Sequence, residues 1–300
     1  MARRVLFVAA ALAALTSSPL RAQAPDKKAP ADRLDGPPHV TARAWAVADG
    51  KTGKLLGGAN EAEPRAIAST TKVMTAWVVL RLAADDPKVL DEVVTFSERA
   101  DKTPGSSAKL NAGEKLPVKE LLYGLLLPSG NDASVALAEH FGPRFGRDEN
   151  LVRSFVGEMN RQAKELKLAE TTYLDTSGLG KNLSSARDLL ALTRHALKDR
   201  RFREYVGTRR REYEVAGPDG AKRTVVWENT NKLLEVEGYD GVKTGTTNAA
   251  GCCLIASGRR GSDHLLVVVL GSTSTDGRYA DARNLFRWAW RQREREPAGR

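Results

Sequence analysis

Residues 66–80 read Ala-Ile-Ala-Ser-Thr-Thr-Lys-Val-Met-Thr-Ala-Trp-Val-Val-Leu. From Val73 onward, apolar residues such as Trp77 recur at helical spacing, so the segment predicts a helix that begins near Ser69. Lys72 follows Ser69 by three residues, and side chains at this spacing share one face of a helix and can meet. The free backbone N–H groups at a helix N-terminus also favour a developing negative charge. The segment therefore predicts a Ser–Lys pair at the start of a helix.

Segments on both sides of this helix predict strands at the two ends of the chain. Alternation over 41–48 and the turn residues at 49–53 predict a β-hairpin. Continuous apolar runs at 252–257 and 265–270 are typical of strands covered on both faces. Helical periodicity is also present at 118–127, 131–140, 151–168, 185–197 and 277–293, the last with an aromatic stripe that we expect to pack against the sheet. The pattern predicts one sheet made from distant segments, with helices inserted between them.

The pair Ser69 and Lys72 has the residue types that a covalent hydrolase requires. A serine hydroxyl becomes a useful nucleophile only when a base removes its proton. Histidine is the usual base. This chain has four histidines, but it lacks the Gly-x-Ser-x-Gly motif of many enzymes in which a histidine activates the serine. Lysine can replace histidine when burial and a neighbouring cation lower its pKa. Ser69 is therefore the candidate nucleophile and Lys72 the candidate general base.

Two further motifs, Ser129-Gly-Asn131 and Lys243-Thr244-Gly245, supply the remaining groups. Ser129 could pass a proton between the base and the leaving group, and Asn131 could hold the base or a substrate amide. Taken alone, the first motif is also typical of a helix-capping loop and the second of a surface strand end. Together with the Ser–Lys pair, in this order, they favour a catalytic site.

The Lys243 motif is the expected substrate-binding strand. Lys243 could supply the cation beside the base and attract a substrate carboxylate, while Thr244 and Gly245 complete the motif. The oxyanion hole would be formed by the backbone N–H groups of Ser69 and Thr246.

The same motifs occur elsewhere in less suitable surroundings. Ser106 and Lys109 have the same spacing but follow Pro-Gly in an expected loop. Outside a helix, a spacing of three residues does not ensure that two side chains meet. Residues 51–53 also read Lys-Thr-Gly, but they lie at the tip of the expected hairpin, where such residues are ordinary turn formers. We therefore predict no catalytic role for either copy.

The three motifs resemble those of the penicillin-recognising serine enzymes, and specifically the low-molecular-weight D-alanyl-D-alanine carboxypeptidases of peptidase family S11. The resemblance covers residues 40 to 290. It is carried by blocks at 66–75, 125–133 and 241–247, and by similar stretches at 105–107, 176–179, 184–188 and 229–234.

This resemblance implies an α+β, multi-layer fold of the β-lactamase/transpeptidase type, with an antiparallel sheet flanked by helices and an inserted helical subdomain at about 85–200. It implies that Ser69 is acylated by the penultimate D-alanine of a peptidoglycan stem peptide and that the terminal D-alanine leaves. Its partners would be the stem peptide and β-lactam antibiotics, which would acylate the same serine. Neither a metal nor another cofactor is expected.

Several alternatives remain open at this level. Shortened relatives include endopeptidases that cut D-alanyl–diaminopimelate crosslinks, and this chain stops at Arg300 without the C-terminal β-domain of many family members. A class A β-lactamase would carry a Glu-x-x-Leu-Asn string, which is absent. An inactive wall-binding protein on the same scaffold would be expected to lose Ser69, Lys72 or Lys243.

The N-terminus has the layout of a secretory signal peptide. Arg3 and Arg4 precede a short apolar run, and small residues follow through 22–24. We expect residues 1–24 to be the signal peptide, 25–39 a Pro-rich tether, 40–293 the catalytic domain and 294–300 a basic tail. The protein is therefore expected in the periplasm or cell envelope.

The composition adds three expectations. Removing the leader lowers the net charge from +10 to +7, which would allow peripheral contact with an anionic wall or membrane surface. No aromatic-plus-basic motif predicts nucleic-acid binding. Cys252 and Cys253 are adjacent, so a disulfide between them would be strained, and we expect both to be small strand residues.

Overall fold

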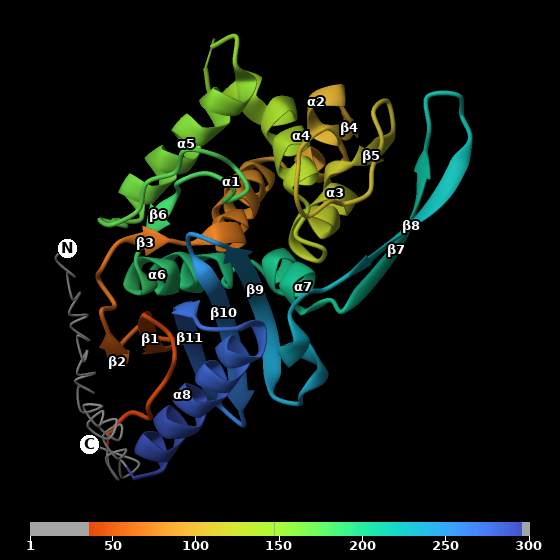
Figure 1. Cartoon of the computed structure of the whole chain (residues 1–300). Coiled ribbons are helices and arrows are strands. Elements are labelled where there is room, and N and C mark those ends of the chain that lie inside the picture. The colour runs from red at the N-terminus through yellow and green to blue at the C-terminus, as the bar shows by residue number, and fades with distance from the viewer. Residues whose placement is uncertain (1–35, 147, 296–300) are drawn as a thin grey trace, which may run out of the picture. The chain divides into compact units, whose positions relative to one another are not determined.

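The computed structural model describes residues 36–146 and 148–295 (Figure 1). The expected signal peptide, most of the expected tether and the last five residues lie outside the described residues. The central feature is a five-stranded antiparallel sheet in the order β2-β1-β11-β10-β9. Its strands are β1 (Ala44–Asp49), β2 (Leu55–Ala59), β9 (Tyr239–Thr247), β10 (Gly251–Arg260) and β11 (Asp263–Ser272).

The order of these strands confirms that one sheet is built from both ends of the sequence. β1 and β2 form the predicted hairpin, and β1 pairs with β11, with Ala44 opposite Leu270. The two apolar runs predicted as strands are β10 and β11, which pair with each other. The expected α+β class, an antiparallel sheet flanked by helices, is confirmed.

The sheet is buried on both faces, because alternate side chains of each strand point to opposite sides. Cys253, Ile255 and Val268 face the large core that contains most of the helices. Leu254 and Val267 face a smaller core formed with the last helix. The two cysteines are both buried and unbonded, as small residues of β10.

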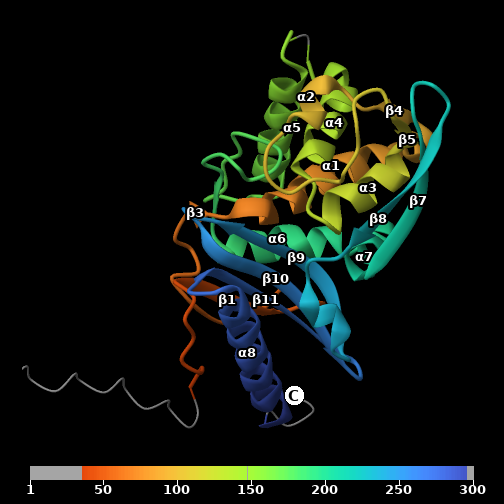
Figure 2. The same ribbon diagram turned by 45° about the vertical axis from the view of Figure 1, so that its right-hand side comes forward.

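Helices cover the two faces. α8 (Thr275–Arg295) packs its aromatic side chains, including Phe286 and Trp290, against one face as predicted. α6 (Ala186–Ala196) contacts β1 and β11 on the other face, and Figure 2 shows the two helices on opposite sides of the sheet. The remaining helices and 3-10 turns are η1 (Ala68–Thr71), α1 (Lys72–Asp85), η2 (Pro87–Asp91), α2 (Glu98–Asp101), α3 (Val118–Leu126), α4 (Asn131–Phe141), η3 (Gly142–Arg144), α5 (Leu151–Glu165), α7 (Arg200–Gly207) and η4 (Lys232–Glu235).

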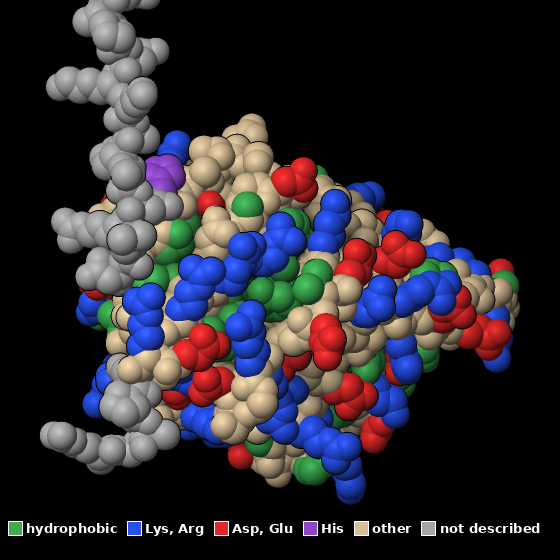
Figure 3. Space-filling view, turned by 90° about the horizontal axis from the view of Figure 1, so that it is seen from below, with side chains coloured by type: hydrophobic (Ala, Val, Ile, Leu, Met, Phe, Trp, Pro, Cys, Tyr) green, Lys and Arg blue, Asp and Glu red, His purple; other side chains and the backbone are tan. Residues whose placement is uncertain are grey.

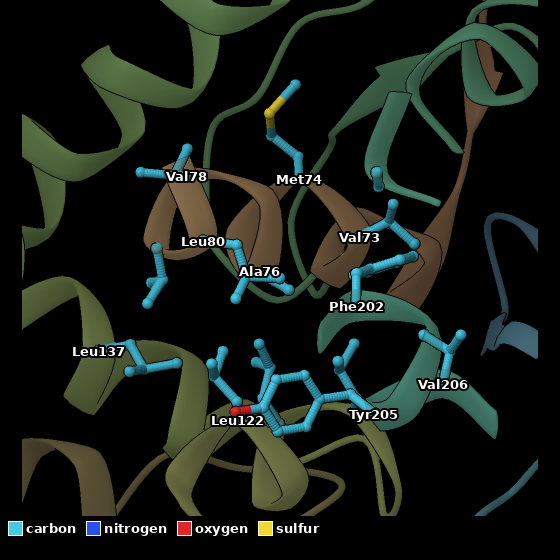
Figure 4. Close-up of a cluster of buried hydrophobic side chains, with 14 of the residues drawn as sticks. Val73, Met74, Ala76, Val78, Leu80, Leu122, Leu137, Phe202, Tyr205 and Val206 are labelled. Carbon is cyan, nitrogen blue, oxygen red and sulfur yellow. The ribbon is translucent and has the colours of Figure 1, made fainter. Parts of the chain in front are cut away.

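α1 lies at the centre of the large core. The sequence predicts one apolar face for it, yet the structure buries the helix almost all round and leaves Trp77 only partly buried. Figure 4 shows its side chains packed against those of α3, α4 and α7; the labelled residues are Val73, Met74, Ala76, Val78, Leu80, Leu122, Leu137, Phe202, Tyr205 and Val206. The first turn of α1 is part of this buried region, and the Lys72 side chain there is shielded from solvent.

Two smaller sheets complete the fold. β3 (Arg65–Ala66) pairs with β6 (Leu183–Ser184). β4 (Val93–Thr95), β5 (Lys115–Pro117), β7 (Arg210–Ala216) and β8 (Lys222–Glu228) form the other, in which β7 and β8 make a long hairpin that the sequence analysis missed. Among the described helices, none combines the length and the apolar character that crossing a bilayer requires.

Candidate active site

Ser69 and Lys72 meet at the junction between η1 and α1. Ser69 lies in the 3-10 turn, and Lys72 is the first residue of the α-helix, so the predicted helix begins three residues later than Ser69. Lys72 Nζ donates a hydrogen bond to Ser69 Oγ at 3.0 Å. The Lys72 side chain is fully buried. The predicted Ser–Lys contact is therefore present.

Asn131 supplies the second partner of Lys72. It is the first residue of α4, and its Oδ1 accepts a hydrogen bond from Lys72 Nζ at 2.7 Å. Its Nδ2 donates to Pro104 O at 2.8 Å, which fixes the orientation of the amide. Of the two tasks that the sequence suggested for Asn131, the structure contains the one on Lys72.

Ser129 lies beside this amide in a constrained backbone conformation. Its φ is +68°, in the left-handed region that non-glycine residues rarely occupy. Its side chain is buried, and Oγ has no hydrogen-bond partner among the described residues. A buried hydroxyl without a hydrogen-bond partner destabilises a folded protein. Strained backbone conformations such as that of Ser129 concentrate at functional sites.

A loop that the sequence analysis did not assign to the site provides the third partner of Lys72. Ser177 O accepts a hydrogen bond from Lys72 Nζ at 2.8 Å. Asp175 holds this loop by accepting from the backbone N–H groups of Ser177 and Gly178. A Cβ on Gly178 would lie 1.9 Å from Ala68 O, so only glycine lets the loop approach η1 this closely. The stretch 176–179 is one of those that carry the family resemblance. Its contact with Lys72 is made by a backbone carbonyl, which any residue type could supply, so the sequence does not predict it.

The third motif lies on β9, next to the nucleophile. A Cβ on Gly245 would be 2.9 Å from Ser69 N, so the glycine allows the strand to approach the backbone of η1. Lys243 is buried, and its Nζ donates to Thr244 O at 3.2 Å. Thr244 Oγ1 shares a hydrogen bond of 2.7 Å with Thr230 Oγ1. The structure thus brings the three predicted motifs together from η1–α1, the start of α4 and β9.

Arg278 is a further charged residue at this strand. It comes from the first turns of α8 and is buried; it donates to Thr246 Oγ1 at 3.0 Å, and its Nε has no partner among the described residues. Arg278 was not predicted from the sequence, because it lies in a different element from β9 and belongs to none of the three motifs.

Burial determines the electrostatics of the two lysines. It lowers the pKa of Lys72 to about 7, although the negative charges of Asp175 and Asp132 act to raise it. Burial also places the pKa of Lys243 well below its ordinary value, with further lowering by the charges of Lys72 and Arg278. Of the two causes predicted for Lys72, burial is the one that lowers its pKa, whereas lowering by neighbouring cations applies to Lys243.

The side chains of the two alternative motif copies take no part in this arrangement, although Ser106 O accepts a hydrogen bond of 2.7 Å from the backbone N–H of Asn131. Ser106 and Lys109 are both exposed, and Lys109 has a φ of +57° in a loop. Residues 51–53 form the turn between β1 and β2, where Asp49 accepts hydrogen bonds from the backbone of Lys51 and Thr52. Both copies therefore occupy the loop and turn positions that the sequence predicted.

Comparison with known proteins now identifies the family. The model of Peptidase_S11, described as D-alanyl-D-alanine carboxypeptidase, matches residues 31–274. The chain belongs to this family. It is 36% identical over 250 residues to the D-alanyl-D-alanine carboxypeptidase DacF of Bacillus subtilis, with 82% of this chain and 61% of the relative covered. It is 35% identical over 289 residues to a D-alanyl-D-alanine carboxypeptidase of Streptomyces, with 94% of this chain and 98% of the relative covered.

Solved structures of S11 relatives agree with the fold. The crystal structure of the Streptomyces K15 DD-transpeptidase matches with a TM-score of 0.80 at 35% identity, and the match covers 85% of this chain and 99% of that one. Penicillin-binding protein 6B of Escherichia coli matches with a TM-score of 0.73 at 35% identity, covering 84% and 78% respectively. The β-lactamase/transpeptidase-like class expected from the resemblance is therefore confirmed. The chain spans 61% of the Bacillus relative but nearly all of the Streptomyces one.

No metal site accompanies this machinery in the part of the chain that the structure describes. There, His, Cys, Asp and Glu side chains form no group of three or more that could hold an ion.

Proposed function

We propose that this S11 protein is a D-alanyl-D-alanine carboxypeptidase that acts on peptidoglycan stem peptides. The observation that carries the proposal is the fully buried Lys72 side chain, whose Nζ lies 3.0 Å from Ser69 Oγ. At neutral pH a large share of Lys72 is unprotonated, because burial lowers its pKa to about 7. A base poised near the working pH is what general-base catalysis requires.

The reaction would proceed through an acyl-enzyme. Lys72 takes the proton of Ser69 Oγ, and the oxygen attacks the carbonyl carbon of the penultimate D-alanine. The backbone N–H groups of Ser69 and Thr246 stabilise the oxyanion. The C–N bond breaks, and the proton returns to the departing D-alanine amine, with Ser129 as the relay. Water then hydrolyses the ester and releases the shortened peptide.

The substrate would be held from both sides of the nucleophile. Lys243, Thr244, Gly245 and Thr246 line one side along β9, and Asn131 lies on the other. The terminal carboxylate of the stem peptide would lie near Lys243, and its negative charge would favour the protonated form of that lysine. The same groups would bind the carboxylate of a penicillin, which acylates Ser69 and blocks it.

The decisive experiment is the intact mass of the purified protein after incubation with benzylpenicillin, measured beside Ser69→Ala and Ser106→Ala. We expect a stable adduct on the wild type and on Ser106→Ala, and none on Ser69→Ala. Release of D-alanine from a peptide ending in D-alanyl-D-alanine should follow the same pattern. An adduct on Ser69→Ala, or full D-alanine release by that variant, would contradict the assigned nucleophile.

One relative's name favours testing an acyl acceptor as well. The Streptomyces K15 protein is named a DD-transpeptidase, so an amine could replace water in the second step. Crosslinked dimers would test the endopeptidase alternative. Product analysis with a D-amino acid acceptor and with crosslinked dimers separates carboxypeptidase, transpeptidase and endopeptidase activity. If transfer to the acceptor or cleavage of dimers is faster than hydrolysis of the linear peptide, the carboxypeptidase assignment would be wrong.

A further inference from the structure

The outer face of α8 carries a row of arginines that the active site does not use. Arg283, Arg287 and Arg291 are spaced four residues apart, and all three are exposed. Residues at this spacing lie on one side of a helix. Within the described residues, none of the three takes part in an ion pair or side-chain hydrogen bond. Their charges are therefore free to act on a partner.

A fourth arginine and a group of aromatic rings extend this row into a surface. Arg260 lies over the Trp290 ring at 4.0 Å from its centroid. Tyr239 contacts Phe286 and Trp290, with ring centroids 5.1 and 6.3 Å apart. Burial raises the pKa of Tyr239, while the charges of Arg260, Arg283 and Arg287 lower it, which places all three near its phenol. We call Arg260, Arg283, Arg287 and Arg291 the cationic face.

Exposed apolar surface adjoins the cationic face. Val236 is 41% exposed, and its carbonyl accepts a hydrogen bond from Tyr239 N. Figure 3 views the end of the domain that is lowest in Figure 1, and it shows Lys and Arg side chains bordering a hydrophobic area. The arrangement of arginines around aromatic and aliphatic side chains is typical of surfaces that lie in the headgroup region of a membrane.

The neighbouring acids do not cancel this charge. Asp240 is paired with Arg259, and Asp263 with Arg293. Glu235 and Glu237 flank Val236, and Glu294 follows Arg291 by three residues on α8; all three are exposed, so the four arginines still outnumber the nearby acids without an ion pair.

We propose that the cationic face docks on the surface of a bilayer that contains anionic phospholipids. The four arginines would attract the headgroup phosphates, and Val236 would enter the interface beside Tyr239. Arg278 at the start of α8 touches β9, whereas Arg291 lies thirteen residues further along the helix, about 20 Å away at the rise of an α-helix. Docking would therefore leave the Ser69 site open and raised above the bilayer.

The test measures binding of the purified protein to vesicles by co-sedimentation at low salt. Vesicles of phosphatidylcholine alone are compared with vesicles of three parts phosphatidylcholine and one part phosphatidylglycerol. The variant Arg283→Glu/Arg287→Glu/Arg291→Glu is compared with Lys88→Glu/Lys164→Glu/Lys198→Glu, which makes the same change in net charge at exposed lysines elsewhere. Melting temperature and the benzylpenicillin acylation rate check that both variants are folded.

We expect the wild type to bind only the anionic vesicles. The α8 variant should lose about tenfold or more in partition coefficient, and the lysine variant less than about threefold. Equal losses in the two variants, or equal binding of the wild type to both vesicles, would overturn the proposal.

Val236→Ser distinguishes a membrane from a soluble anionic polymer. It should weaken binding to anionic vesicles and leave binding to soluble polyphosphate unchanged. If Val236→Ser binds vesicles like the wild type, and the α8 variant loses both ligands in proportion, the face would recognise a polyanion and the membrane assignment would be wrong.

Discussion

At the scale of single residues, the proposed site centres on one fully buried lysine. Three acceptors surround Lys72 Nζ: Ser69 Oγ, Asn131 Oδ1 and Ser177 O. They hold the side chain in place, while burial favours its neutral form. The orientation and the basicity of Lys72 therefore have separate causes, which can be tested separately.

Removing the amine should slow acylation by about 10²- to 10⁴-fold, the usual contribution of a positioned general base. We expect Lys72→Ala to fold and to react with benzylpenicillin at this reduced rate, measured by the growth of the adduct mass. Lys109→Ala, from the exposed motif copy, is the matched control and should react normally. A normal rate for Lys72→Ala would remove Lys72 as the base.

The pH dependence of acylation tests the basicity. Because the pKa of Lys72 is lowered to about 7, the rate constant should rise with pH through this region and level off above it. Second-order rate constants from pH 5 to 9 would measure the inflection. In Asn131→Asp a carboxylate replaces the amide 2.7 Å from Lys72 Nζ, so the inflection should move to higher pH. A profile that is flat across neutral pH would contradict this view.

The residues that the sequence could identify are those that we propose to act through their side chains. Ser69, Lys72, Ser129, Asn131 and Lys243 stood in short motifs with distinctive spacing, and the fold brings their motifs together. Ser177 acts through its carbonyl and Arg278 comes from a distant helix, so neither leaves a local pattern in the sequence.

At the scale of elements, the site depends on close approach between β9 and η1. The approach is possible because Gly245 has no side chain. A Cβ at this position would lie 2.9 Å from Ser69 N and 3.0 Å from Thr70 N. A sequence pattern can indicate both elements, but it cannot give their distance.

Gly245→Ala should push β9 away from η1. We expect acylation by benzylpenicillin to fall at least about tenfold, since small displacements of positioned groups are costly in rate. The matched control is Gly157→Ala in α5, where a Cβ would meet nothing within 4 Å and alanine favours the helix, so acylation should not change. Unchanged acylation in Gly245→Ala would show that the approach is not required.

Elements with clear hydrophobic periodicity were predictable, and those stabilised by tertiary contacts were not. The helices at 118–126 and 186–196 agree with their patterns. The β7–β8 hairpin was missed, since its strands carry alternate charged residues that resemble a solvated loop; Arg211 is paired with Glu120, and Arg223 with Glu114. These ion pairs come from α3 and the segment before β5, which the local sequence does not reveal.

At the scale of the whole molecule, Arg293 ties together parts of the chain that are far apart in sequence. From the last turns of α8, it pairs with Asp49 at the end of β1 and with Asp263 at the start of β11. Burial acts to raise the pKa of Asp49, but hydrogen bonds from Thr52 and Arg293 lower it to about 2.

Asp49→Asn should therefore destabilise the protein in a pH-dependent way. The folded-state pKa lies below the unfolded value of 3.8, so the carboxylate stabilises the fold above that pH, and the effect is lost as pH falls towards 2. We expect a loss of about 1 kcal/mol in the free energy of unfolding at pH 7, modest because the pair is partly solvated. Urea unfolding at pH 7 and pH 3 would measure it, with Asp85→Asn as the control at an exposed carboxylate. A difference that does not shrink on acidification would contradict the assignment.

The pairing of β1 with β11 has a consequence for how the chain reaches its native state. Ala44 lies opposite Leu270, so β1 and the central strand β11 are adjacent in the sheet but more than two hundred residues apart in the sequence. Closing so long a loop costs conformational entropy before any ladder bond repays it. The helices between the strands can form from local contacts, but β1 and β2 have no central partner until β11 has been synthesised. Any nascent or truncated chain that stops before β11 would therefore expose the apolar edge of β1.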